Sequence, residues 1–167
     1  MKKLLFIVIG LLLIAVTIII IIICKFVNNK KIVIGEDKMV SLVLCSGKSH
    51  ETIVINVDEE GKVDVYMGSL FDVKEGKILM WGIDTRQRKT LNENDFNEIK
   101  QCIENIDFQQ PNPLKTFVAG AAEMWLIIYD TTYKGFNYKT DNANIDYLID
   151  KLQELSPVRI QDITSFY

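Results

Sequence analysis

The sequence predicts an α+β protein in which an N-terminal transmembrane helix precedes a single two-layer domain. Three observations lead to this prediction: a long uncharged run near the N-terminus, several short segments with alternating apolar residues, and two later segments with helical periodicity. The expected order after the anchor is ββββ-α-ββ-α. Neighbouring strands in this order are expected to form local hairpins, and hairpins combined with two helices favour an antiparallel sheet that the helices cover.

The uncharged run LLFIVIGLLLIAVTIIIIIIC covers the 21 residues 4–24. A helix rises about 1.5 Å per residue, so this length matches a hydrocarbon core about 30 Å thick. A cleavable signal peptide has an apolar core of about 7–15 residues followed by small residues, whereas bulky isoleucines end this run. Ile23 also departs from the small residue that bacterial lipid attachment requires before a cysteine such as Cys24. We therefore expect residues 1–27 to form a permanent signal anchor in contact with membrane lipid.

Basic residues flank both ends of the anchor: Lys2, Lys3, Lys25, Lys30 and Lys31. The positive-inside rule compares the two ends, and here the comparison nearly ties. A Lys-Lys start followed at once by a long apolar run is typical of a signal anchor, and it favours an extracytoplasmic domain at the C-terminal side. We expect residues 28–37 (NNKKIVIGED) to be a tether and residues 38–167 to be one domain.

The part of the chain beyond the anchor is acidic. It contains 16 of the 19 Lys and Arg residues and all 22 Asp and Glu residues, which gives a net charge of −6. This charge argues against a nucleic-acid partner, because nucleic acids bind clustered Lys and Arg. A single histidine and the absence of a C-x-x-C pair argue against a structural zinc site. We therefore expect neither a metal nor a cofactor.

Four strands are expected before the first helix. ETIVINV (51–57) and KVDVYMG (62–68) each place apolar residues on one side, and the turn sequence DEEG (58–61) between them predicts a hairpin. The flanking strands are expected within MVSLVLCSG (39–47) and KILMWGIDTRQRKTL (77–91).

In the second half of the domain, the spacing of the apolar residues changes from alternating to helical. LNENDFNEIKQCIENI (91–106) has helical spacing, with Asn92 or Asn94 as the N-cap. EMWLIIYD (123–130) alternates again, and we expect it to turn through TTYKG into a second strand at FNYKT (136–140). The segment NANIDYLIDKLQELS (142–156) is the second expected helix, and Pro157 ends it.

One set of residues in this half carries a resemblance: Glu123-x-Trp125-x-Ile127-x-Tyr129, then Gly135 with Tyr138, then the helix with Leu148 and Leu152 that ends at Leu155-Ser156-Pro157. This set resembles uncharacterised small single-anchor membrane proteins of Gram-positive bacteria. The resemblance covers about residues 90–160, and its motifs are mostly structural. It implies a bacterial protein with one anchor and an α+β domain, and it implies no activity.

Two groups of residues are candidates for binding. The basic cluster Arg86, Arg88 and Lys89 could hold a phosphate, a carboxylate polymer or anionic lipid headgroups. It could equally be a solvated edge strand whose positive charge prevents pairing with another sheet. Trp125 and Tyr129 alternate on a strand that is apolar on both faces, which indicates either a covered central strand or a surface for a protein partner.

The only histidine, His50, lies in SGKSHE (46–51) next to a serine. Catalysis by such a pair also needs an orienting acid and an oxyanion hole, and a solvated turn explains the same residues. The piece Gly47-Lys48-Ser49 resembles the end of a phosphate-binding loop, but Leu42 occupies the position of the required upstream glycine. We therefore do not expect an enzyme.

The cysteines leave two possibilities open. Cys45 and Cys102 could pair in an oxidising space, or they are two small buried residues, one on a strand and one on a helix. The function that we expect is a membrane-tethered binding or regulatory module for a protein or envelope partner. The alternatives are a membrane-proximal enzyme that uses His50 with nearby hydroxyls or carboxylates, and a structural envelope protein.

Overall fold

A computed structural model describes residues 14, 16–19, 32–34, 38–46, 51–74, 77–116, 122–136 and 138–156. The chain divides into two compact units, Met1–Lys31 and Ile32–Tyr167. In the first unit, residues 14 and 16–19 are helical and exposed, and most of the predicted anchor lies outside the described residues. No helix within the described parts of the chain combines the length and the apolar character that a membrane crossing requires.

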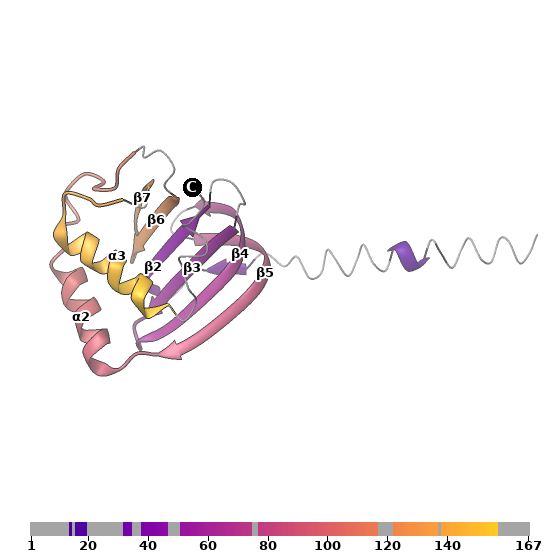
Figure 1. The fold of residues 1–167 in the computed structure, drawn as a ribbon, viewed down its shortest axis with the longest axis horizontal. Helices are drawn as coiled ribbons and strands as arrows, with labels where there is room; N and C mark the ends of the chain where they lie inside the picture. The colour runs from indigo at the N-terminus through magenta and orange to yellow at the C-terminus, as the bar shows by residue number, and fades with distance from the viewer. Residues whose placement is uncertain are drawn as a thin grey trace, which may run out of the picture. The chain divides into compact units, whose positions relative to one another are not determined.

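The described residues of the second unit form a seven-stranded antiparallel sheet with the order β1-β5-β4-β3-β2-β6-β7 (Figure 1). The strands are β1 (Ile32–Ile34), β2 (Lys38–Cys45), β3 (Glu51–Asp58), β4 (Lys62–Lys74), β5 (Lys77–Thr90), β6 (Glu123–Ile128) and β7 (Thr131–Phe136). The helices are α2 (Glu93–Glu104) and α3 (Ala143–Leu155). The predicted α+β class and the antiparallel sheet are confirmed.

Both helices begin at an asparagine. The side-chain oxygen of Asn92 accepts a hydrogen bond from the backbone N–H of Asp95 at 2.9 Å, and Asn142 caps α3 in the same way. The Nζ of Lys151 on α3 lies 2.8 Å from Asp95 and 2.6 Å from Glu98 on α2. These ion pairs join the exposed sides of the two helices, while their apolar sides pack on the sheet.

Apolar residues are buried on both faces of the sheet. One cluster lies between the sheet and the two helices and includes Leu42, Ile55, Val63, Ile103 and Leu148. A second cluster contains the side chains that project from the other face: Val43, Cys45, Val54, Tyr66, Ile78, Met80, Trp125 and Ile127. Residues 52–57 of β3 are therefore all buried, which explains why this strand is almost continuously apolar.

The sheet curls because β4 and β5 are long and irregular, and Figure 1 shows both as curved strands. The pairing register of β4 with β5 shifts between Met67 and Ser69 and again between Leu70 and Asp72, and such bulges bend a strand. Gly68 lies at the first shift, where a Cβ atom would be 2.9 Å from the carbonyl oxygen of Gly82. The curl brings Ile78 and Met80, at the start of β5, into the second cluster. The other members of this cluster lie on β4, β3, β2 and β6.

Two elements differ from the prediction. The segment expected to be a tether contains β1, because Ile32–Ile34 pairs with residues 78–80 of β5 and adds a strand to the sheet edge. The second hairpin turns earlier than expected. The N–H of Tyr129 donates to the carbonyl oxygen of Met39 at 2.9 Å and Tyr129 has φ 48°, so the chain reverses at residues 129–130 and TTYKG itself belongs to β7.

Candidate binding site

The candidate site is centred on Asp64, whose side chain is only 3% exposed although it carries a carboxylate. Asp64 lies in β4 directly opposite Asn56 of β3 and Arg88 of β5. Directly opposed residues of antiparallel strands project from the same face of a sheet. The three side chains therefore form a polar row on the face that is turned away from the helices, beside the second apolar cluster.

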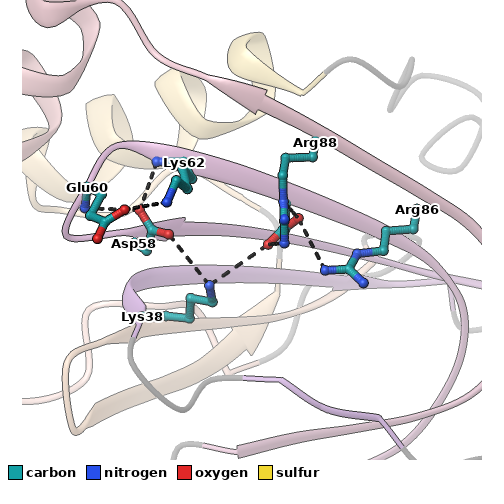
Figure 2. Close-up of polar contacts among 7 residues, drawn as sticks. Lys38, Asp58, Glu60, Lys62, Arg86 and Arg88 are labelled. Atoms are coloured by element: carbon teal, nitrogen blue, oxygen red, sulfur yellow. Dashed lines mark hydrogen bonds and ion pairs between the residues drawn. The ribbon is translucent and has the colours of Figure 1, made fainter.

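Arg88 grips the Asp64 carboxylate with two hydrogen bonds. Its Nε donates to Oδ1 at 2.7 Å and its Nη2 donates to Oδ2 at 2.9 Å. Arg86 and Lys38 also approach this carboxylate: the Nη2 of Arg86 lies 3.7 Å from Oδ1, and the Nζ of Lys38 lies 3.9 Å from Oδ2. Figure 2 shows the side chains of Arg88, Arg86 and Lys38 pointing toward one another. A two-bonded guanidinium–carboxylate pair is strong and also fixes the plane of the guanidinium. The orientation of Arg88 is thus set by a group that is itself held inside the sheet.

Burial alone would raise the pKa of Asp64. The hydrogen bonds from Arg88 and the positive charges of Arg88, Arg86 and Lys38 outweigh burial, and together they hold this pKa below its ordinary value. The hydrogen bond to Asp64 in turn raises the pKa of Arg88. The Asp64 carboxylate is therefore charged at neutral pH, and it is poorly suited to accept or donate a proton there.

Both arginines remain accessible to a ligand. The side chains of Arg86 and Arg88 are 53% and 57% exposed, and the guanidinium of Arg86 lies 5.2 Å from the ring centroid of Tyr66. A guanidinium has five N–H donors, and Arg88 uses two of them on Asp64. The two arginines together can therefore offer hydrogen bonds to a carboxylate or a phosphate group. We call Arg86 and Arg88 the arginine pair.

A groove of about 390 Å³ lies at the β3–β4 turn, and Lys38, which also contacts Asp64, is one of its lining residues. Its lining residues are Lys38, Asp58, Glu59, Glu60 and Lys62. Two hydrogen bonds hold the turn on its inner side. Asp58 Oδ1 accepts them from the backbone N–H groups of Glu60 at 3.0 Å and Lys62 at 2.8 Å. The Nζ of Lys38 lies 3.9 Å from Asp58 as well as from Asp64, so it links the groove with the arginine pair (Figure 2).

Asn56 is the unusual member of the polar row. It is fully buried, and neither its side-chain nitrogen nor its side-chain oxygen has a hydrogen-bond partner among the described residues. A buried amide without partners costs about 1–3 kcal/mol, so few such groups persist in folded proteins. Within the described part of the chain, the hydrogen-bonding capacity of the Asn56 amide is therefore unused.

The residues that the sequence predicts for binding lie at different places in the structure. Arg86 and Arg88 lie together at the site. Lys89 lies opposite Val63, which belongs to the cluster under the helices, so Lys89 projects from the other face. Trp125 is buried in the second cluster, whereas Tyr129 is 50% exposed in the β6–β7 turn. Trp125 and Tyr129 therefore do not form a common patch.

The sequence pattern did not indicate that Lys38, Asn56 and Asp64 belong to the site. The alternation in KVDVYMG placed Asp64 on the face opposite Val63, but it did not reveal that this face is covered. His50, the residue of the catalytic alternative, lies outside the described residues. Within the described ranges, no group of three or more His, Cys, Asp or Glu residues is arranged to hold a metal ion.

The cysteines are free and buried on opposite sides of the sheet: Cys45 in the second cluster and Cys102 on α2. The interpretation as two small buried residues on a strand and a helix is thus confirmed. Burial raises the pKa of both thiols, which lowers their reactivity. The Cys102 thiol also donates to the carbonyl oxygen of Asn144 at 2.9 Å.

Asp64 should contribute to the pH dependence of stability. Because its folded pKa lies below the ordinary value of 3.8, the unfolded chain binds the proton first as the pH falls. The stabilisation by Asp64 is therefore complete above this value and is lost as the pH falls through the folded pKa. In urea unfolding of the full-length chain in detergent between pH 6 and pH 2, Asp64→Asn should be less stable than wild type at pH 6 and should lose less stability below pH 4. Asp72→Asn, an exposed change on the same strand, should retain the wild-type slope, and equal slopes for wild type and Asp64→Asn would contradict this role.

No protein-family model and no curated protein matches this chain. What the protein does must therefore be argued from the geometry of its own residues.

Proposed function

We propose that this chain is a membrane-tethered binding or regulatory module whose binding surface is the arginine pair. Residues 4–24 would anchor it in the lipid bilayer, and the sheet domain would lie outside the cytoplasm and engage a protein or another envelope component. One observation carries the proposal. A buried carboxylate orients Arg88 through two hydrogen bonds while more than half of each arginine side chain stays exposed.

The chemistry of the arginine pair favours a ligand with one discrete anionic group. Two adjacent guanidiniums can share a carboxylate or a phosphate, and the orientation fixed by Asp64 reduces the entropy lost on binding. The rest of the domain is acidic, with a net charge of −6 beyond the anchor. An extended anionic surface would meet this repulsion, whereas a single anionic group held at the arginine pair would meet it only weakly.

Binding is better supported than catalysis at this site. The groups paired with Asp64 or opposite it in the sheet are two guanidiniums, an ammonium and an amide, and none of these types is an ordinary nucleophile or general base at neutral pH. Burial, followed by the charge of Asp64, raises the pKa of the nearby Tyr66 phenol, so it is a poor base as well. The Asp64 carboxylate is itself held in its charged form by its neighbours. An enzyme that uses His50 would have to act elsewhere on the chain.

Removing one exposed guanidinium should weaken anion binding without unfolding the domain. The full-length chain in detergent at low ionic strength is titrated with triglutamate and, separately, with inorganic phosphate. Arg86→Gln should lower the affinity for the bound anion about threefold to fivefold, as expected for one exposed charge pair, and 0.5 M KCl should reduce binding further. Lys139→Gln, an exposed change of the same charge away from the site, serves as the control. Equal losses for the two variants would mean that the arginine pair has no special role.

The proposed topology has its own test. A tag is placed after Tyr167, and intact cells stripped of their wall are treated with protease. Loss of the tag before lysis is the expected result, because it places the C-terminal side outside the cytoplasm. A tag that survives until lysis, and is then cleaved, would place the domain inside and direct the search towards cytoplasmic partners.

A further inference from the structure

The arginine pair and the groove carry opposite charges at neighbouring positions. Arg86 and Arg88 offer cations at one end, and the exposed side chains of Glu59 and Glu60 lie at the other, where Lys62 pairs with Glu60. Lys38 lies between them and is bridged to Asp58 and Asp64 by ion pairs of 3.9 Å (Figure 2). These two contacts are long compared with the fork from Arg88, so the Lys38 ammonium is held less firmly than the Arg88 guanidinium.

The groove is large enough to matter. Its volume of about 390 Å³ lies within the range of about 300–1,000 Å³ that is typical of small-ligand sites. Its walls are charged, which argues against an apolar occupant, because burying these charges under apolar atoms would remove their hydration without replacing it. A polar ligand with charge of both signs would match the groove and the arginine pair at once.

Asn56 adds an independent observation about the same ligand. Its buried amide can both donate and accept hydrogen bonds, and it does neither with the residues that the structure describes. It lies directly opposite Asp64 on the same face of the sheet. A peptide group, which presents one acceptor and one donor, is the chemical complement of a side-chain amide.

We propose that the site binds a short peptide-like ligand that carries both a carboxylate and an ammonium group; this rests on the proposed function of the arginine pair as an anion-binding surface. The carboxylate lies at Arg86 and Arg88, and the ammonium lies in the groove at Glu59 and Glu60. Asn56, opposite Asp64 in the register of β3 with β4, is the buried amide on this face that a peptide group of the ligand contacts. The acidic domain does not repel this ligand, because the net charge of the ligand is zero.

Trialanine is a suitable probe, because it has one ammonium and one carboxylate. Its N-acetylated form lacks the ammonium, and its C-terminal amide lacks the carboxylate. Binding to the full-length chain in lipid nanodiscs is followed by NMR at two places, the Nε–H groups of Arg86 and Arg88 and the backbone amide of Gly61 in the groove turn. Trialanine should bind about threefold or more tightly than either blocked form, as expected for partly exposed charge pairs.

Variants of the protein complete a double-mutant cycle with the blocked ligands. Arg86→Gln should remove the advantage that the carboxylate gives and leave the advantage of the ammonium. The double change Glu59→Gln and Glu60→Gln should do the reverse, and Glu154→Gln, an exposed change on α3, should do neither. If the acetylated form binds as tightly as trialanine and still shifts the arginine Nε–H groups, the site binds an anion only. The mixed-charge proposal then fails while the proposed function stands. If no form shifts these groups, both fail.

Asn56→Leu separates a structural role of Asn56 from a binding role. Leucine has a similar shape, and replacing a buried amide without partners removes an unfavourable desolvation. The variant should therefore fold at least as stably as wild type in urea unfolding, yet bind trialanine at least threefold more weakly. Unchanged affinity in a folded Asn56→Leu variant would overturn the contact between Asn56 and the ligand.

Discussion

A carboxylate lies inside the sheet at Asp64, and the arrangement of the candidate site follows from the need to balance its charge. An isolated charge at 3% exposure would be very costly, so it must meet cations from neighbouring strands. β5 supplies Arg88 and Arg86, and β2 supplies Lys38. The carboxylate therefore ties its own strand, β4, to the adjacent strand β5 and to β2, which lies beyond β3 in the sheet. It also gives Arg88, whose side chain is more than half exposed, a defined orientation.

The second constraint is the burial of β2 and β3 on both faces. Two helices cover one face, and the curl of β4 and β5, made possible by the register shifts and by Gly68, brings apolar residues over part of the other. The polar row begins where this apolar cluster ends. The site thus lies at the border between the covered part of the sheet and the exposed end of β5, where charged groups can be both oriented by the fold and reached from solvent.

Much of the fold follows from local sequence, because local interactions decide it. The DEEG turn, the hairpin of β3 with β4, and the start of α2 at Asn92 depend on residues close together in the chain. β1 was missed because its pairing with β5 joins residues more than forty positions apart. The β6–β7 turn was misplaced because Tyr129 adopts a backbone conformation that bulky residues rarely adopt. Tertiary contact with Met39 supports that conformation.

The candidate site was only half predictable for the same reason. Arg86 and Arg88 are visible in the sequence as a basic cluster, but their partner Asp64 is found only when the register of β4 against β5 is known, and two bulges shift that register. The central claim, that Asp64 fixes Arg88, is tested most directly by ¹⁵N relaxation of the arginine Nε–H groups. Arg88 should be as ordered as the backbone of β5 in wild type, and it should become as mobile as an unpaired surface arginine in Asp64→Asn. An Arg88 side chain that is already mobile in wild type, or that stays ordered in Asp64→Asn, would contradict this account.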